Sequence, residues 1–441
     1  MRFHPEVFHR RLLDPDSRGL PCKAPGFFGR RLAYLRLALW LVILPGWAMA
    51  QTTDLTAAIN AATPGTVIAL AGGDYGAVGL RGIGGSPDQP VIIRSADPGD
   101  PARFSGLDLR DAENLVLENL VFDYTFENGQ RSQYKPFNIA GGQNITLRGA
   151  VFDGDVARGL SQTDDGFATG FGLVVRGVSG FVLEDSVISG FWKGLSIQDS
   201  TDITVRRNTL YGMRSDGMNY VQVERVLIAE NYIHDFDRAP DSPDHADMIQ
   251  FWTKDTTRPT RDVVIRDNVF NSGNGLYTQT IFMRNDMVDQ GAAGPEMFYR
   301  NITITGNIII NAHLHGISVG EADGLMISNN TLIRNRRSQG EADNPARWTP
   351  VISISERSRN VQVLRNVTAD VRGFDGQGDW TITDTFLIQD QGRLDPGFYD
   401  SVFVNATDGD PQDLGSFAYL PGGPLDGAGL GAPQLNNPVQ R

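Results

Sequence analysis

Cysteine is almost absent from this sequence of 441 residues, which contains a single one, Cys22. One cysteine cannot form an intrachain disulfide, so the sequence excludes the small scaffolds that depend on a disulfide framework. The fold must be stabilised by the packing of apolar side chains.

Positive charge is also scarce. The chain has 39 Lys and Arg against 52 Asp and Glu, a net charge of −13. Because nucleic-acid binding needs a basic face, we do not expect nucleic acid as a partner. Without residues 1–50 the chain has eight fewer basic and three fewer acidic residues, and its net charge is −18. A polyanionic ligand would then need a local basic patch or a bridging cation.

Long apolar runs are missing, apart from one short run near the N-terminus. Arg30, Arg31 and Arg36 precede the apolar run 37–44, and Ala48 and Ala50 follow it. This order is typical of a secretory signal with cleavage before Gln51, so we expect a secreted or periplasmic protein. The alternative is a membrane anchor, but a run of about 14 residues is shorter than a bilayer span. After cleavage we expect no membrane association.

What the sequence does contain is a repeated phrase: a short strand, a polar bend and a second short strand, with apolar residues alternating on both sides of the bend. We count nine copies, whose bend positions are Leu120, Ala150, Ser186, Asn208, Asn231, Asn268, Asn307, Asn330 and Asn366. Six of the nine bends therefore carry asparagine.

The spacing of these bends is that of a solenoid. Consecutive bends lie between 22 and 39 residues apart, from Ser186 to Asn208 at the short end and from Asn268 to Asn307 at the long end. A constant register with loops of variable length is the signature of stacked coils. Since coils stack about 4.8 Å apart, we expect the asparagine amides to bond along the axis. Asparagine also tolerates left-handed backbone angles, which the bend could require.

With this phrase, the chain resembles the right-handed parallel β-helix proteins of the pectin-lyase-like superfamily, from about Gln51 to the C-terminus. Residues 54–62 read as a short amphipathic helix, and residues 64–75 resemble the opening of many β-helix polysaccharide lyases. Residues 90–108 resemble the early coils of alginate lyases and chondroitinase B.

This resemblance implies an all-β fold, a single-stranded right-handed parallel β-helix with an N-terminal capping helix. We expect residues 1–50 to be a leader, 51–394 the β-helix and 395–441 a C-terminal cap that wraps the last coil and protects its edge. The architecture serves lyases, epimerases, hydrolases and adhesins alike, so it implies no single activity. We expect a monomer.

A second family of strands lies between the repeated phrases. Its members occupy residues 194–198, 217–222, 247–252, 280–286, 316–321 and 351–356. Stacked coil on coil, they form a parallel sheet with polar outward positions. Two long insertions, residues 235–247 and 334–350, precede its third and last strands. Insertions on one face of a solenoid usually wall a binding groove, so we place the site here.

The candidate residues suit β-elimination from a uronate sugar in an acidic polysaccharide. That reaction needs a positive group to neutralise the carboxylate and a base to remove the adjacent proton. Arg284 is the predicted neutralising group and His245 the predicted base, whose ordinary pKa is near neutrality. Asp216 and Asp247 complete the predicted catalytic set. Predicted substrate-binding residues are Asn219, Gln250, Trp252, Lys254 and His315.

A calcium ion is a further expectation, because Asp216, Asp244 and Asp247 could supply oxygen ligands. Lys254 and His315 are also reserve candidates for the base, and Lys254 is one of only three lysines after residue 50.

Each candidate also has a structural interpretation. Asp216 could form a turn before Gly217, His245 could hold a loop in place, and Arg284 could be an exposed ion-pair partner. Trp192 and Trp252 could stack on sugar rings or simply pack.

Two other functions stay open. Residues 214–219, 244–247 and 313–318 occur in the order of the polygalacturonase motifs, so paired aspartates could act in a glycoside hydrolase. The second of these segments, residues 244–247, lacks the adjacent Asp-Asp pair of that family's motif, and the D-P-H motif of mannuronan epimerases is absent as such. A non-catalytic polysaccharide-binding or surface protein is the third possibility.

Overall fold

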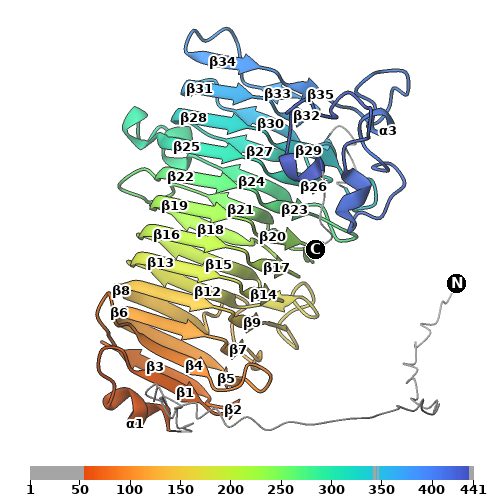
Figure 1. Ribbon diagram of the computed structural model, residues 1–441. Helices are drawn as coiled ribbons and strands as arrows, with labels where there is room; N and C mark the ends of the chain where they lie inside the picture. Colours follow the sequence, from red (N-terminus) through yellow and green to blue (C-terminus); the bar gives the residue numbers. More distant parts are fainter. Residues whose placement is uncertain (1–53, 341–343, 345–346, 437–441) are drawn as a thin grey trace, which may run out of the picture. The chain divides into compact units, whose positions relative to one another are not determined.

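The computed structural model describes residues 54–340, 344 and 347–436. These residues form a stack of parallel rungs, each rung contributing strands to two long sheets of 21 and 12 strands (Figure 1). The predicted leader, with Cys22 and the cleavage point before Gln51, lies outside the described residues. Within them, no helix is long and apolar enough to cross a bilayer.

The larger sheet holds two columns of strands. The first column, which carries the second strand family, comprises β3 (Ala77–Arg81), β6 (Gly106–Glu118), β8 (Phe137–Arg148), β12 (Phe171–Arg176), β15 (Lys193–Gln198), β18 (Met218–Val221), β21 (Asp247–Phe251), β24 (Gln279–Met283), β27 (His315–Val319), β30 (Val351–Ile354) and β33 (Val371–Arg372).

The second column shares the long strands β6 and β8. It continues them on either side with β1 (Val67–Leu70), β4 (Val91–Ser95), β13 (Ser179–Glu184), β16 (Thr201–Arg206), β19 (Glu224–Ala229), β22 (Arg261–Arg266), β25 (Tyr299–Thr305), β28 (Ala322–Ser328), β31 (Arg359–Leu364) and β34 (Trp380–Thr383).

The smaller sheet forms the other side of each rung, after the bend. Its strands are β2 (Gly73–Asp74), β5 (Ala102–Phe104), β7 (Val121–Asp123), β9 (Val151–Asp153), β14 (Val187–Ser189), β17 (Thr209–Tyr211), β20 (Tyr232–His234), β23 (Val269–Asn271), β26 (Ile308–Asn311), β29 (Thr331–Arg334), β32 (Val367–Thr368) and β35 (Phe386–Leu387).

The remaining elements are short. They are α1 (Leu55–Asn60), α2 (Asp286–Asp289), α3 (Tyr399–Val402), three single 3₁₀ turns at Pro295–Met297, Leu414–Phe417 and Pro433–Asn436, and an antiparallel pair, β10 (Asp155–Val156) with β11 (Ala168–Thr169). Helix α1 falls inside the predicted segment 54–62. The Asp54 side chain accepts from the backbone N–H of Ala57, and Leu55 is buried in the core. That α1 closes the end of the stack stays a prediction.

The core fills the space between the sheets. Apolar residues at the same offset stack from rung to rung; Phe122 and Phe152, for example, lie ring on ring with centroids 4.6 Å apart. Such continuous burial of apolar side chains is the main stabilising term available to a chain without disulfides.

The predicted asparagine ladder is present. Asn231 donates from Nδ2 to Asn268 Oδ1 over 2.9 Å, and Asn268 donates in the same way to Asn307 Oδ1 over 3.0 Å. The same contact joins Asn208 to Asn231, Asn307 to Asn330 and Asn330 to Asn366. Every one of these six side chains is at most 1% exposed.

One detail of the bend differs from expectation. The left-handed backbone angle belongs to the residue before the ladder asparagine: φ is +54° at Arg207, +59° at Glu230 and +57° at Asp267. The ladder position therefore selects asparagine for its amide, which donates and accepts at once, and not for its tolerance of positive φ.

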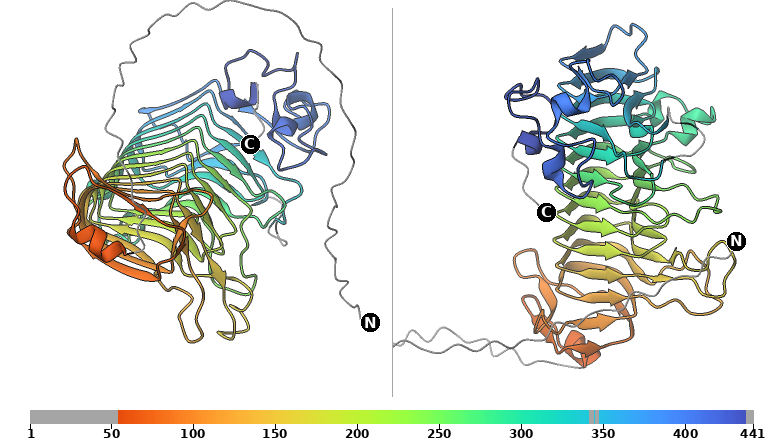
Figure 2. Two further views of the ribbon diagram at one scale, coloured as in Figure 1. Left: turned by 60° about the horizontal axis from the view of Figure 1, so that its bottom comes forward. Right: turned by 90° about the vertical axis from the view of Figure 1, so that its right-hand side faces the viewer.

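The C-terminal segment also differs from expectation, because it packs on the flank of the stack. Tyr399, Phe403 and Phe417 form one apolar cluster with Ile308 and Ile333, which face outward from the smaller sheet. The Tyr419 hydroxyl lies 2.6 Å from the hydroxyl of Thr331. In Figures 1 and 2 this segment, drawn in dark blue, lies beside β26 and β29. The apolar outer residues of these strands explain the position, since they would otherwise face water.

Candidate functional site

Most of the predicted site residues converge on one cavity of about 320 Å³ on the first strand column. We call it the lysine cavity. It is lined by six residues predicted from the sequence, His245, Asn219, Gln250, Trp252, Lys254 and Arg284. The register explains this convergence, because Asn219 on β18 pairs with Gln250 on β21, which pairs with Phe282 on β24.

Three lysines give this cavity a positive charge. Lys135, Lys193 and Lys254 all line it, and they are all the lysines that follow residue 50. Lys135 lies over the ring of Phe171, with Nζ 5.1 Å from the ring centroid. Among the described residues, neither Lys135 nor Lys254 has a carboxylate partner. The cavity is therefore a local basic patch in an acidic protein.

Arg284 lines the same cavity but is already engaged. Its Nε lies 3.3 Å from Asp286 Oδ1 and 3.3 Å from Asp289 Oδ2, and its side chain is 51% exposed. Both the functional and the structural interpretation of Arg284 thus match its surroundings, since it faces the cavity and is an exposed ion-pair partner.

Asp216 lies behind the cavity wall, held by Lys193. Lys193 Nζ is 2.5 Å from Asp216 Oδ2, and Asn219 Nδ2 donates to the same oxygen over 2.9 Å. Asp216 is 2% exposed. Its other oxygen accepts from the backbone N–H of Asp247 over 3.2 Å. The Asp216 carboxylate therefore links the side chains of Lys193 and Asn219 to the backbone of the next rung.

Asp247 is buried beneath His245. The His245 side chain is 62% exposed and its Nδ1 lies 3.8 Å from Oδ2 of Asp247, which is fully buried. Neither oxygen of Asp247 has a hydrogen-bond partner among the described residues. Burial raises the pKa of Asp247 to about 7. Interaction with Asp247 in turn raises the pKa of His245 above its usual value of 6.5.

Asp244 points away from the other two aspartates of the predicted calcium site. Its Oδ2 accepts from Arg214 Nε over 3.1 Å and from Trp192 Nε1 over 3.1 Å. Arg214, which is 4% exposed, also reaches Asp164 over 2.6 Å. Across the described ranges, no three His, Cys, Asp or Glu side chains are grouped so that they could hold a metal ion. Calcium therefore takes no part in the proposal below.

The remaining candidates lie on the cavity walls. Trp252 lines the lysine cavity and is partly exposed, whereas Trp192 is 8% exposed and packs edge-on against Phe171. His315 lies outside the lysine cavity. It lines the neighbouring cavity of about 500 Å³, and its Nδ1 is hydrogen-bonded to the Ser318 hydroxyl over 2.7 Å.

Sequence reasoning missed Lys193 and Lys135. The signal for Lys193 was present, because Gly194 and Gly217 begin equivalent strands, which aligns Lys193 with Asp216 one rung away. Lys135 precedes β8 in a loop that the repeat does not describe, so periodicity could not place it.

Comparison with known proteins agrees with the fold. A family model described as "Right handed beta helix region" matches residues 100–239 and 168–280. A search of the curated proteins finds no match.

Solved structures with related folds include a surface adhesin of Streptococcus pneumoniae (14% identity, TM-score 0.43, covering 60% of this chain and 76% of that one). An alginate lyase from a Paenibacillus species is 15% identical with a TM-score of 0.34, and the match covers 67% of this chain and 94% of that one. The A-module of a mannuronan C-5 epimerase from Azotobacter vinelandii is 13% identical with a TM-score of 0.37, and the match covers 76% of this chain and 93% of that one. At such scores none of them bears on activity.

The in-register columns of parallel strands, the internal asparagine ladder and the matched family model lead to one conclusion: the chain folds as a right-handed parallel β-helix.

Proposed function

We propose that this protein binds an acidic, uronate-containing polysaccharide in the lysine cavity and cleaves it by β-elimination. One observation carries the proposal: three lysines and Arg284 line a single cavity in a chain whose net charge is −13. Positive groups gathered in a cleft of an acidic protein favour a polyanionic ligand, since they attract its carboxylates while the rest of the surface repels them.

Lys254 is our first choice for the group that neutralises the uronate carboxylate. It is exposed and has no carboxylate partner among the described residues, whereas Arg284 lies near two aspartates. Neutralisation makes the adjacent C–H more acidic, because the enolate-like transition state gains charge at the same carboxylate. Arg284 is the second choice, and the substitutions described in the Discussion distinguish the two.

His245 is the proposed base. In its neutral form the exposed imidazole takes the proton from C5 of the sugar; the electron pair forms the C4–C5 double bond and the C4–O bond breaks. The departing oxygen takes a proton from solvent. Asp247 does not line the cavity; it positions the His245 ring and stabilises the imidazolium that forms.

The hydrolase alternative gains less support from the geometry. Inverting hydrolysis needs two carboxyl groups on either side of the scissile bond. Asp216 and Asp247 are 2% and 0% exposed, and neither lines a described cavity. A bound sugar could not touch them without rearrangement of the wall.

The test is incubation of the purified protein with alginate, pectate and glycosaminoglycans. Ultraviolet absorbance from an unsaturated uronate product, lost in His245→Ala with an unchanged circular dichroism spectrum, is the expected result. New reducing ends without that absorbance would show a hydrolase instead, and binding without cleavage would show a binding protein; either outcome overturns the proposal.

A further inference from the structure

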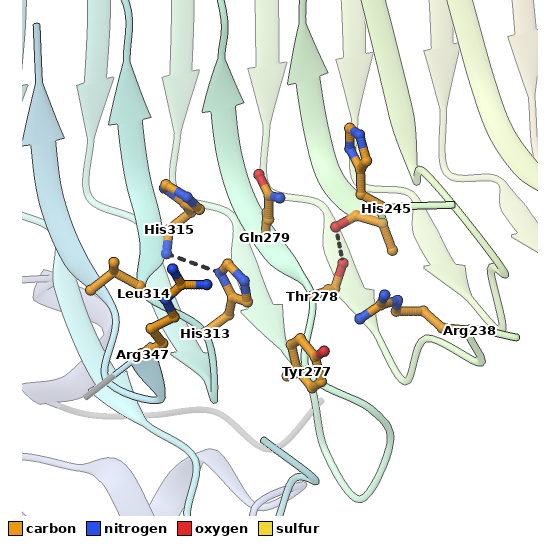
Figure 3. A pocket seen from close by; sticks show the side chains of 10 residues that line it. Arg238, His245, Tyr277, Thr278, Gln279, His313, Leu314, His315 and Arg347 are labelled. Carbon is orange, nitrogen blue, oxygen red and sulfur yellow. Dashed lines mark hydrogen bonds between the residues drawn. The ribbon is translucent and has the colours of Figure 1, made fainter. Parts of the chain in front are cut away.

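A second cavity, of about 500 Å³, lies next to the lysine cavity and shares His245 with it. We call it the histidine cavity, and Figure 3 shows it from close by. Its walls come from the two long insertions, which contribute Arg238 and Arg347, and from the loops before β24 and β27, which contribute Tyr277 and His313.

These loops are bonded to one another. The backbone N–H of Tyr277 donates to the carbonyl of Gln339 over 3.0 Å, and that of Leu276 donates to the carbonyl of Phe236 over 3.3 Å. The Thr278 hydroxyl bonds to the carbonyl of Ala246, as Figure 3 also shows. The loops that precede β21, β24 and β30 are therefore joined into one wall, which is the preorganisation expected of a binding site.

Flat groups stack along this wall. The guanidinium of Arg238 lies 4.9 Å from the ring centroid of Tyr277, whose ring is 5.5 Å from that of His313 with an interplanar angle of 6°. His313 in turn lies 5.2 Å from the ring of His315. Such a row of aromatic faces with a cation at one end suits a sugar ring that bears a negative charge.

The polar groups of the cavity point to the same ligand. His313 Nδ1 accepts from the backbone N–H of His315 over 3.1 Å, which leaves the proton of the neutral ring on Nε2 as a donor. Burial and the positive charges of His315, Arg238 and Arg347 lower the pKa of His313 to about 3, so the ring stays neutral. The buried Nε of Arg238 and Oε1 of Gln279 have no hydrogen-bond partner among the described residues.

We propose that the histidine cavity is a subsite for a second carboxylate-bearing sugar of the same polymer, with Arg238 binding the carboxylate and Tyr277 and His313 facing the ring. The part of this inference that concerns cleavage rests on the proposed function. Because His245 belongs to both cavities, a seated polymer carries a carboxylate on each side of His245. The preferred substrate class is therefore a polymer of consecutive uronates, in place of one in which uronates alternate with uncharged sugars.

The first experiment measures binding alone. Galacturonate and mannuronate, single sugars without a glycosidic bond to cleave, are titrated by ligand-observed NMR against galactose, mannose and galactose 6-sulfate. Binding of the uronates but not of the neutral sugars is expected. In a Lys254→Gln background, which removes the proposed carboxylate contact of the lysine cavity, Arg238→Gln should weaken uronate binding at least about tenfold, as expected for loss of a charge-assisted bond. Arg238→Lys should restore part of it. The matched control is Arg225→Gln, because Arg225 pairs with Asp202 and lines neither cavity.

Equal binding of neutral sugars, a preference for the sulfated sugar, or full uronate binding by a folded Arg238→Gln in the Lys254→Gln background would overturn the inference. If Arg238→Gln does not fold, Arg238→Lys and Tyr277→Leu carry the same test.

The second experiment uses the polymers. Arg238→Gln should raise KM for alginate or pectate about tenfold with little change in kcat, because Arg238 does not contact the bond that breaks. Polymers of consecutive uronates should be cleaved at least about tenfold faster than alternating glycosaminoglycans at equal concentration. If no polymer is cleaved but uronate binding depends on Arg238, the proposed function fails and the subsite stands. If cleavage occurs without any dependence on Arg238, the subsite fails alone.

Discussion

His245 Nδ1 lies 3.8 Å from Oδ2 of Asp247, so a largely exposed imidazole rests on a fully buried carboxylate. Because the Asp247 side chain is fully buried, water cannot replace this interaction, and neither of its oxygens has a hydrogen-bond partner among the described residues. The protonation states of the two residues are therefore linked, and the first two predictions follow from this link.

The pH dependence of cleavage should change in Asp247→Asn. Interaction with Asp247 raises the pKa of His245 above 6.5, and a base acts only when it is unprotonated. In the wild type, kcat/KM should rise with pH through a pKa above 6.5. Loss of the carboxylate lowers the pKa of His245, so the rising limb should move to lower pH while the maximal rate falls. An unshifted limb in a folded Asp247→Asn protein would remove His245 from the role of base.

The stability of the fold should also depend on Asp247. Its pKa rises from 3.8 to about 7 on burial, so the folded protein holds a proton that the unfolded chain has lost. This contribution to stability is fully present below pH 3.8 and is lost as pH rises through about 7. Asp247→Asn cannot ionise, so its stability relative to the wild type should increase as pH rises from 3.8 to about 7. Urea unfolding of both proteins at several pH values measures the difference; parallel curves would contradict it.

Lys254→Gln should weaken cleavage more than Arg284→Gln. Lys254 has no carboxylate partner in the described part of the chain, whereas Arg284 lies 3.3 Å from both Asp286 and Asp289. We expect a loss of about 100-fold in kcat/KM for Lys254→Gln, which corresponds to about 2.7 kcal/mol of transition-state stabilisation. Wild-type binding should also weaken with added salt. The opposite order of the two variants would assign the neutralising role to Arg284, and Arg225→Gln serves again as the control.

Asn268 should be among the most sensitive positions of the stack. It is fully buried, its Nδ2 donates to the carbonyl of Ile228 and to Asn307, and its Oδ1 accepts from the backbone and side chain of Asn231. Asn268→Leu leaves several buried polar groups without partners, each worth about 1–3 kcal/mol. We expect a loss of about 3 kcal/mol or more in the free energy of unfolding. Asn436→Leu, near the C-terminus and exposed, is the control and should unfold like the wild type.

The sequence was sufficient to predict the rungs, the amide ladder and the convergence of His245, Gln250 and Lys254 on one cavity. The reason is geometric: in stacked coils, residues at equal offsets from the repeated phrase must become neighbours. Once the register of β18, β21 and β24 is recognised, their outward residues share one surface.

What escaped prediction depends on loops, on distant segments and on backbone angles that the apolar pattern of the repeat does not encode. Asp244 turns to Arg214 and Trp192 because the insertion folds back on the rung below, and no periodicity encodes that turn. The position of Tyr399 and Phe403 on the flank was missed because their partners, Ile308 and Ile333, look like ordinary strand residues in the sequence. The left-handed residue of each bend was assigned one place too late for a similar reason: Arg207 and Glu230 carry no composition signal for positive φ.

Ladder asparagines are as little as 23 residues apart, as Asn208 and Asn231 are, so that one short coil forms a complete structural module. A duplicated or excised segment of that length would join its neighbours without disturbing their amides. It would nevertheless displace the lysines relative to His245 in steps of about 4.8 Å. The spacing of charged subsites along the axis is therefore set in steps of one coil, while the interior packing of each coil stays the same.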